Sequence, residues 1–135
     1  MKKYMDRKLT VRLEHLGIQG SHGIYLLAIS QNRGASLKEI ANYMMVDKSI
    51  TTRTVGLLME MGFAINESND PRRYSIVLTD KGERAVELVN ASFGEIWDDI
   101  LSDLTDEERK AFRSICTKIN AKLNEEYSEP KEARN

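Results

Sequence analysis

Residues 36–82 read SLKEIANYMMVDKSITTRTVGLLMEMGFAINESNDPRRYSIVLTDKG, two short helical patterns followed by a hairpin pattern. Ser36 opens S-L-K-E, a capping box completed by Glu39, which predicts a helix that stops just before the next N-cap. That N-cap is Asp47, and Gly62 ends the second helix in the manner of a C-cap glycine. Two short helices joined by a few residues predict a helix-turn-helix.

The hairpin pattern carries two adjacent arginines at its turn. FAINES and YSIVL alternate apolar and polar residues, which predicts two short antiparallel strands. Pro71 stiffens the connecting loop and lowers the entropy lost when it is ordered. Arg72 and Arg73 follow it, and arginine is attracted by the enhanced negative potential of a narrow DNA minor groove. The alternative is that Asp70 and the two arginines neutralise one another in an ordinary surface turn.

Helical patterns also precede and follow this region. The predicted helices cover about 3–16, the segment between a cap at Ser21 and a closing Gly34, about 79–101, and 105–127 behind a second capping box, T-D-E-E. The polar residues 128–135 are expected to form a tail. The fold class is therefore mainly α with a small two-stranded β wing: a winged helix-turn-helix flanked by N- and C-terminal helices.

Composition excludes several classes of protein. A chain of 135 residues suits one domain, and it contains no apolar run of transmembrane length and no signal-peptide pattern. The single cysteine, Cys116, indicates a reducing cytoplasm. The net charge is −1, but residues 1–94 carry +3 and residues 95–135 carry −4, so local fields matter more than the total.

The second helix of the motif has two different faces. The residues expected to pack inward are Ile50, Thr54, Leu57, Leu58 and Met61. The outward residues, at i, i+3, i+4 and i+7, are Ser49, Thr52, Arg53 and Gly56. Arginine can bond guanine bidentately and hydroxyls reach bases or phosphates, so this face suits a major groove. The alternative is an ordinary solvent-exposed face. The arginine-tipped hairpin that follows makes DNA contact the better interpretation.

Residues 18–90 resemble the multiple-antibiotic-resistance regulator (MarR) family of bacterial transcription regulators. The most specific part is the wing, with Asp70, Arg72 and the run Leu78, Thr79, Asp80, Lys81 and Gly82. The resemblance implies that the helix over about 47–61 is the recognition helix. It also implies that Arg72 enters the minor groove and that Asp70 orients the wing. Pro71 stands where the commoner wing has arginine, which leaves open whether Arg72 or Arg73 reaches deepest.

These arguments divide the single domain 1–135 into functional parts. The expected parts are an N-terminal dimerisation helix (1–20), the winged helix-turn-helix (21–82, with its wing at about 63–78), C-terminal dimerisation helices (83–127) and the tail (128–135). The expected DNA-contacting residues are Ser36, Lys48, Ser49, Thr51, Thr52, Arg53, Asp70, Arg72 and Arg73.

Dimerisation is inferred from apolar stripes on the last two helices. The stripe of the first comprises Val89, Phe93, Ile96 and Ile100, widened by Ala85, Leu88, Trp97 and Leu101; that of the second comprises Phe112, Ile115, Ile119 and Leu123. A stripe of this width is more often intramolecular core, but these helices flank a complete small domain. We therefore expect mutual burial in a homodimer that reads a pseudo-palindrome.

Other residue groups carry weaker signals. His15, His22 and Cys116 lack the spacing of a metal site, so no metal or cofactor is expected. Cys116 is expected to be a small core residue rather than a redox sensor. The tyrosines and methionines Tyr4, Tyr25, Tyr43, Met44, Met45, Met59 and Met61 are either core or the lining of a ligand pocket. No nucleophile–base pair or phosphate-binding glycine loop points to an enzyme.

Three functions follow from these patterns. The first is a dimeric, sequence-specific DNA-binding regulator in the bacterial cytoplasm, a repressor by family resemblance, released by a small aromatic ligand. The second is a winged-helix protein-interaction module without sequence-specific DNA binding. The third, an enzyme on this scaffold, has no supporting chemistry. Steep salt dependence would separate DNA binding from the second.

Overall fold

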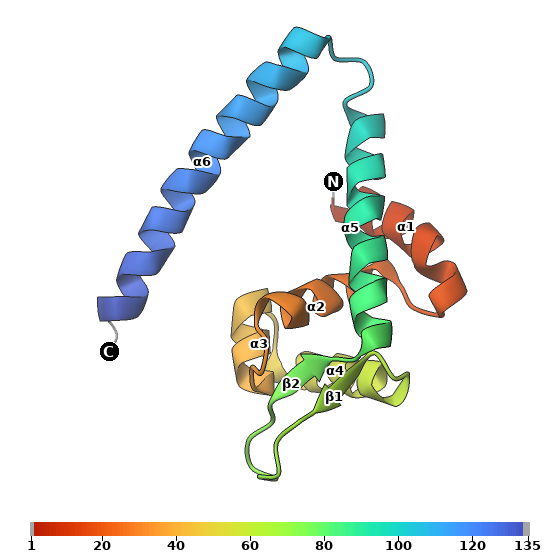
Figure 1. Ribbon diagram of the computed structural model, residues 1–135, viewed down its shortest axis with the longest axis vertical. Helices are drawn as coiled ribbons and strands as arrows, with labels where there is room; N and C mark the ends of the chain where they lie inside the picture. Colours follow the sequence, from red (N-terminus) through yellow and green to blue (C-terminus); the bar gives the residue numbers. More distant parts are fainter. Residues whose placement is uncertain (1, 134–135) are drawn as a thin grey trace. The chain divides into compact units, whose positions relative to one another are not determined.

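The computed structural model describes the backbone of residues 2–133 and the side chains of residues 3–125 (Figure 1). The chain forms two compact units, one ending at Ile96 and the other beginning at Trp97. The first unit contains the helix-turn-helix and the wing. No helix in the described part of the chain is long and apolar enough to cross a membrane.

Helix α1 (Lys2–Leu13) covers most of the first expected helix, and its last turn tightens into the 3₁₀-helix η1 (Glu14–Leu16). Helix α2 (Gly20–Gln31) begins before the expected cap at Ser21. The cap is Gln19, whose backbone N–H donates to Nδ1 of His22 at 3.0 Å. The expectation of a Ser21 cap is therefore wrong, because the hydrogen bond between Gln19 and His22 starts the helix earlier.

The helix-turn-helix consists of α3 (Leu37–Met44) and α4 (Lys48–Glu60). The capping box is confirmed: Glu39 N–H donates to Ser36 Oγ at 3.1 Å, and Ser36 N–H donates to Glu39 Oε1 at 3.3 Å. Between the helices, Met45 adopts a left-handed conformation with φ 56°. Asp47 lies at the N-cap position of α4 without a side-chain capping bond.

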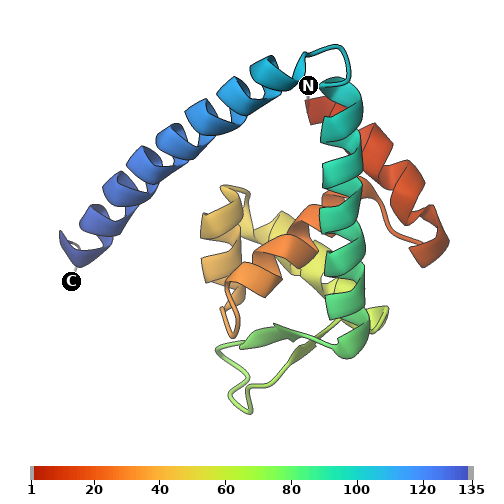
Figure 2. The same cartoon turned by 45° about the horizontal axis from the view of Figure 1, so that its top comes forward.

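The wing is an antiparallel pair, β1 (Ala64–Asn66) and β2 (Ile76–Leu78), with Ile65 opposite Val77. Both strands are shorter than the alternating patterns that predicted them. Ala35, just before α3, forms an isolated bridge to Ile76, so the wing is attached to the helix-turn-helix. In both views the loop between the strands extends beyond the helices of this unit (Figures 1 and 2).

Two long helices complete the chain, α5 (Asp80–Ile100) and α6 (Asp106–Ala133). The second capping box is also confirmed, since Glu108 N–H donates to Thr105 Oγ1 and Thr105 N–H to Glu108 Oε1. Helix α6 continues past the expected end near Tyr127.

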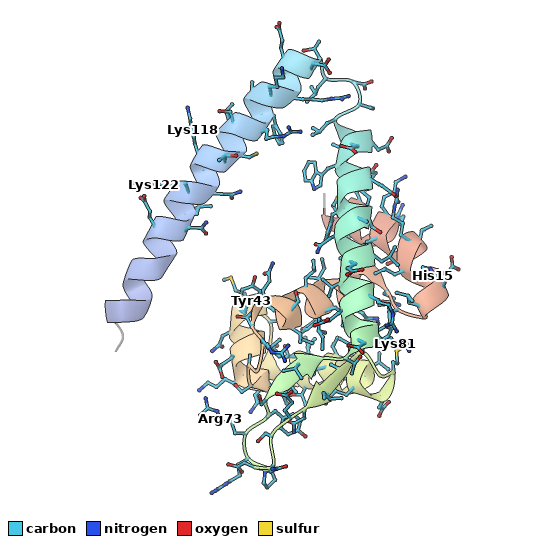
Figure 3. The ribbon with its side chains drawn as sticks, in the orientation of Figure 1. His15, Tyr43, Arg73, Lys81, Lys118 and Lys122 are labelled. Atoms are coloured by element: carbon cyan, nitrogen blue, oxygen red, sulfur yellow. The ribbon has the colours of Figure 1, made fainter. Side chains whose placement is uncertain are left out.

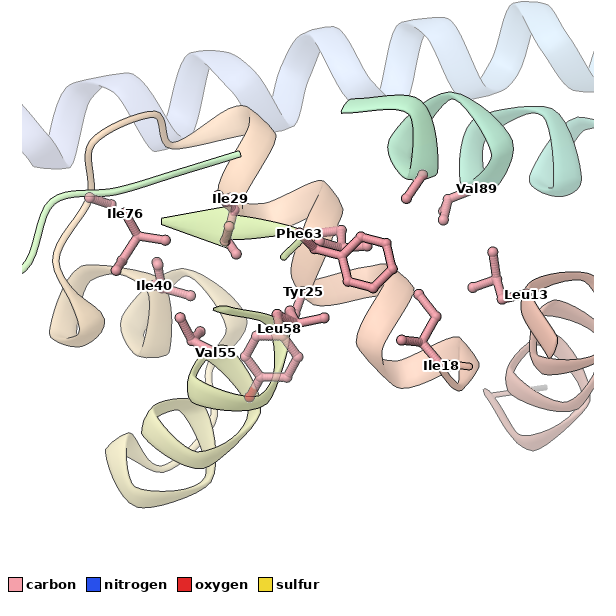
Figure 4. Close-up of a cluster of buried hydrophobic side chains, with 14 of the residues drawn as sticks. Leu13, Ile18, Tyr25, Ile29, Ile40, Val55, Leu58, Phe63, Ile76 and Val89 are labelled. Atoms are coloured by element: carbon pink, nitrogen blue, oxygen red, sulfur yellow. The ribbon is translucent and has the colours of Figure 1, made fainter. Parts of the chain in front are cut away.

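The core of the first unit gathers side chains from all of its helices and from the wing (Figure 4). Helix α2 is central, since it contacts α1, α3, α4 and β2. On α4 the buried residues are Thr51, Val55 and Leu58. Ile50 and Leu57, which were expected to face inward, are 40% and 39% exposed. The helix is therefore rotated from the expected orientation, because the i, i+4, i+7 set that packs on α2 begins at Thr51.

Candidate nucleic-acid interface

The surface of α4 opposite the core is polar and accessible. Lys48, Ser49, Thr52 and Arg53 are exposed, as expected. Thr52 Oγ1 donates to the carbonyl oxygen of Lys48 at 2.8 Å, which fixes its rotamer and leaves its oxygen as an acceptor. A Cβ added at Gly56 would meet no heavy atom within 4 Å, so open space lies over the helix there. Together these residues form a surface that a DNA groove could contact.

Thr51 does not belong to this surface. It is fully buried, and its hydroxyl lies 3.2 Å from the hydroxyl of Tyr25 on α2. Its inclusion among the expected DNA-contacting side chains is wrong, because a helix that exposes Thr52 and Arg53 must turn residue 51 toward the core. Thr51 instead joins α4 to α2.

The tip of the wing is organised by Asp70. Its carboxylate oxygen accepts the backbone N–H of Arg72 at 2.9 Å and lies 3.5 Å from Nε of the same residue. Its carbonyl accepts the N–H of Arg73 at 3.2 Å, which closes the turn around Pro71. The Arg72 side chain is 90% exposed. Asp70 thus shapes the backbone that presents Arg72 to solvent.

Asn66 holds the base of the same loop, a role that sequence reasoning missed. Its side-chain oxygen accepts the N–H groups of Ser75 at 2.9 Å and Ser68 at 3.1 Å. Glu67 N–H donates to the Ser75 carbonyl at 2.8 Å beside it. An asparagine at a strand end that precedes a turn commonly bonds nearby backbone, which is the signal that could have identified it.

Arg73 lies on the α3 side of the wing (Figure 3), where its Nη2 is 3.7 Å from Oε1 of Glu39. The backbone N–H of Ser36, then its hydroxyl, and to a smaller extent Arg73 hold the pKa of Glu39 below its usual value. One carboxylate therefore caps α3 and pairs with the wing. Arg72 and Arg73, adjacent in sequence, have different partners.

The motif Leu-Thr-Asp-Lys-Gly joins the wing to the end of α4. Lys81 Nζ donates to the carbonyl of Met61 at 2.7 Å and lies 4.5 Å from the centre of the Phe63 ring. Thr79 Oγ1 donates to the carbonyl of Gly62 at 2.6 Å. A Cβ at Gly82 would lie 2.0 Å from the Phe63 carbonyl oxygen, so only glycine allows this approach. These contacts set the position of α4 relative to the wing.

A largely apolar cavity of about 320 Å³ lies beside α4 in the first unit. It is lined by Met5, Asp6, Leu9, Gly20, Ser21, Ile24, Tyr25, Met44, Val46, Ile50 and Phe93. Three of these, Met44, Val46 and Ile50, come from the end of α3, the turn and the first turn of α4. Of the seven tyrosines and methionines that the sequence left undecided, Tyr25 and Met44 line this cavity and Met59 and Met61 pack against the core. Tyr4, Tyr43 and Met45 are exposed, so the expectation of core or pocket lining is wrong for these three.

The apolar stripes of α5 and α6 have different environments. On α5, Ala85 and Val89 belong to the hydrophobic core of the first unit, so this part of the expected dimer surface is intramolecular core. Ile96 is also buried. In the second unit, Trp97 packs at 6.5 Å from the ring of Phe112. The exposed apolar face of α6 comprises Phe112, Ile115, Ile119 and Leu123, each between 41% and 55% exposed.

The two histidines and the cysteine have different structural environments. His22 caps α2, and partial burial lowers its pKa while the carboxylate of Asp6 opposes this shift. His15 is exposed in η1, and Cys116 is half-buried on α6. Among the described residues, no group of three or more histidine, cysteine or acidic side chains is arranged to hold a metal ion.

Sequence comparison finds curated relatives of one kind, although no protein-family model matches the chain. HTH-type transcriptional regulator BilQ of Clostridium symbiosum is 32% identical over 98 residues, covering 70% of this chain and 67% of that protein. BilQ of Clostridioides difficile is 36% identical over 89 residues, 64% of this chain; the match spans 60% of that relative. Uncharacterized HTH-type transcriptional regulator YwoH of Bacillus subtilis is 29% identical over 84% of this chain and 83% of its own.

Solved structures agree with these relatives. A crystal structure of MarR is 28% identical, with a TM-score of 0.79 over 94% of this chain and 88% of that one. The MepR–DNA complex of Staphylococcus aureus, 24% identical, shares the fold with a TM-score of 0.70 over 90% and 91% of the two chains. The relatives are transcription regulators, not enzymes. The chain belongs to the MarR family of winged helix-turn-helix transcription regulators.

Proposed function

We propose that the protein is a sequence-specific DNA-binding repressor that acts as a homodimer in the bacterial cytoplasm. The observation that carries this proposal is the pairing of two exposed elements. The polar face of α4 and the arginine-bearing wing belong to one compact unit, in which Glu39 of α3 pairs with Arg73 of the wing and Lys81 of α5 bonds the carbonyl at the end of α4. A helix and a hairpin held in this way suit adjacent grooves of one duplex.

Each exposed residue has a distinct proposed task. Arg53 reads a guanine, with Ser49 and Thr52 contacting neighbouring bases or phosphates. Lys48 binds phosphate as a point charge near the N-terminus of α4. Ser36 caps α3 and its hydroxyl hydrogen contacts phosphate.

The two wing arginines divide the remaining work. Arg72, whose side chain is 90% exposed, enters the minor groove. Arg73, bound to Glu39 of α3, meets the phosphate backbone at the edge of the groove. Asp70 acts through the backbone of Arg72 rather than on DNA, because a carboxylate repels phosphate. We therefore propose that Arg72 reaches deeper than Arg73, because Arg72 is the more exposed of the two.

Dimerisation rests on the exposed face of α6. Four large apolar side chains at i, i+3, i+7 and i+11 form a continuous stripe, which a monomer would leave in water. Burial against a second copy around a two-fold axis removes this cost. The two α4 helices would then meet half-sites about 34 Å apart, or a multiple of this distance, in a pseudo-palindromic operator.

A small aromatic ligand is the proposed signal for release from DNA. One solved relative, Rv2887 of Mycobacterium tuberculosis, was crystallised with salicylic acid. In this chain the cavity beside α4 has the size and apolar lining of small-molecule sites. Asp6 is the one charged side chain among its lining residues, so an uncharged or cationic aromatic compound suits it better than an aromatic acid.

The test is selection from a pool of random duplexes with the wild-type protein, Arg53→Ala and Arg72→Ala in parallel. We expect the wild type to enrich an inverted repeat. Arg53→Ala should relax the preference at particular base pairs, while Arg72→Ala should weaken binding near flanking A·T tracts. Affinity for the enriched duplex should fall steeply with salt concentration, since bound phosphates release counterions.

The protein-interaction module is the other outcome of this experiment. If the wild type enriches no sequence even at low salt, DNA binding is refuted. The arginine-tipped wing would then be better explained by an acidic protein partner, because it offers charge but no base readout.

A further inference from the structure

We propose that Tyr25 is a positioning residue for α4, and that it transmits occupancy of the cavity to the DNA-contacting face through its hydrogen bond to Thr51. The proposal rests on the proposed function, in which the cavity holds the effector. It adds the particular contact that couples the two sites.

Tyr25 has two surroundings at once. Tyr25 lines the cavity, and its hydroxyl lies 3.2 Å from Oγ1 of Thr51 on the buried face of α4. Tyr25 is only 5% exposed and Thr51 is fully buried. A hydroxyl in such a place depends on its protein partner, because losing the bond leaves a buried polar group unsatisfied.

Thr51 is adjacent in sequence to the exposed face. Thr52 and Arg53 follow it directly, and Ser49 lies two residues before it. Because a helical turn is nearly rigid, a displacement of Thr51 also moves these three side chains. An error of about 1 Å in their position is enough to disturb bidentate contacts with a base.

The two ends of α4 are held differently. At the C-terminal end, Lys81 and Thr79 bond the carbonyls of Met61 and Gly62, so this end is tied to the start of α5. At the N-terminal end, Val46 and Ile50 line the cavity. A change in the cavity should therefore tilt the N-terminal half of α4 about its fixed C-terminal end.

These contacts suggest the direction of the effect. A compound that fills the cavity presses on the Tyr25 ring and on Ile50 together, which lengthens or breaks the bond to Thr51. The DNA-bound protein requires the intact arrangement, so occupancy and DNA binding oppose each other. The expected coupling is about tenfold in DNA affinity, within the usual range for allosteric proteins.

The experiment fills the cavity covalently and so needs no knowledge of the natural effector. Ser21→Cys, on the cavity wall, is made in a Cys116→Ser background and treated with benzyl methanethiosulfonate. The introduced thiolate attacks the reagent, forms a disulfide to the benzylthio group and releases methanesulfinate. Mass spectrometry verifies complete labelling, and dithiothreitol removes the label.

Two properties are measured before and after labelling. The first is affinity for the duplex enriched by selection, and the second is amide hydrogen exchange of residues 48–54 against residues 55–60. We expect labelling to lower affinity about tenfold and to raise exchange mainly in 48–54, both reversed by dithiothreitol. Labelling at the exposed position His15→Cys, outside the cavity, should change neither property.

Variants of the hydrogen bond decide whether Tyr25 carries the signal. Tyr25→Phe and Thr51→Val, each added to the Ser21→Cys, Cys116→Ser protein, should bind DNA more weakly before labelling, and labelling should then lower their affinity by less than about a further twofold. Thr51→Ser, added to the same protein, keeps the hydroxyl and should respond to labelling like the Ser21→Cys, Cys116→Ser parent, which a merely structural role for residue 51 would not predict.

Equal responses to labelling in the Ser21→Cys, Cys116→Ser parent and in its Tyr25→Phe and Thr51→Val derivatives would overturn the proposal while leaving an effector cavity intact. Unchanged exchange in residues 48–54 of the labelled Ser21→Cys protein would also overturn it. If no duplex is bound at all, the DNA proposal fails, yet the exchange measurement still tests the link between cavity and α4.

Discussion

Arg73 of the wing lies 3.7 Å from Glu39 of α3, and the same carboxylate accepts the backbone N–H of Ser36 at the start of that helix. The pair connects two segments that are 34 residues apart in sequence. Both side chains are largely exposed, so the ion pair orients the wing more than it stabilises the fold.

The first prediction concerns the two members of this pair. Glu39→Gln should raise DNA affinity, because it removes a negative charge beside the phosphates and releases Arg73. Its effect on stability should be under about 1 kcal/mol, since glutamine also forms capping boxes. Arg73→Gln should lower affinity and reduce the slope of log K against log salt by about 1. DNA titrations at several salt concentrations measure the affinity and the slope for both variants. A fall in affinity for Glu39→Gln would contradict the placement of Glu39 and Arg73 beside the phosphates.

The pH dependence of stability should show the same carboxylate. The pKa of Glu39 is lowered in the folded state, so its ionised form stabilises the fold. This contribution to the free energy of unfolding is complete above the ordinary pKa of glutamic acid and is lost as pH falls through the lowered value. Glu39→Gln mimics the protonated form. The free energies of unfolding of the wild type and Glu39→Gln should therefore differ at neutral pH and converge in acid. Urea unfolding of both proteins across this range is the measurement. A difference that grows in acid would have the wrong sign.

Gly56 offers a test of close approach to DNA. Neither Gly56 nor Gly94 has atoms within 4 Å of an added Cβ, and both lie inside helices. Each change to alanine should stabilise the protein by up to about 1 kcal/mol. Only Gly56→Ala should weaken DNA binding, because its methyl group would occupy the space over α4. If the two variants bind DNA equally well, the groove does not approach this part of the helix.

Arg53 and Lys48 should have different effects although both are cationic and exposed. Arg53→Ala should cost about 1–3 kcal/mol at the base pair that it reads and relax specificity there. Lys48→Ala should weaken binding to all sequences alike and lower the salt slope by about 1. Competition between single-base variants of the operator distinguishes these effects. If both variants lose affinity equally for all sequences, Arg53 does not read a base.

The exposed face of α6 predicts the oligomeric state. Ile119→Asp places a charge in the middle of the apolar stripe and should shift the protein toward monomer, with a matching loss of affinity for the full operator. Asn120→Asp adds the same charge at the neighbouring exposed position and serves as the control. Analytical ultracentrifugation over a range of concentrations measures both. A dimer that tolerates Ile119→Asp must use another surface.

Local signals were sufficient for much of this protein. Both capping boxes, at Ser36 and Thr105, appear where the sequence predicts them, since each needs only residues three positions apart. The helix-turn-helix and the wing followed from periodicity and from turn residues in the same way. These features depend on backbone preferences that neighbouring residues determine, so they can be read without knowledge of the tertiary structure.

Tertiary packing decided what depends on distant partners. Ile50 and Thr51 are adjacent and both can occupy a core, but contact with Tyr25 turned Thr51 inward and left Ile50 at the cavity. Helical periodicity cannot resolve such a rotation, because neighbouring residues differ by only about 100° around the axis. The pairing of Arg73 with Glu39 could not be predicted from the sequence either. It arises only when the chain folds and brings separated segments within reach of one another.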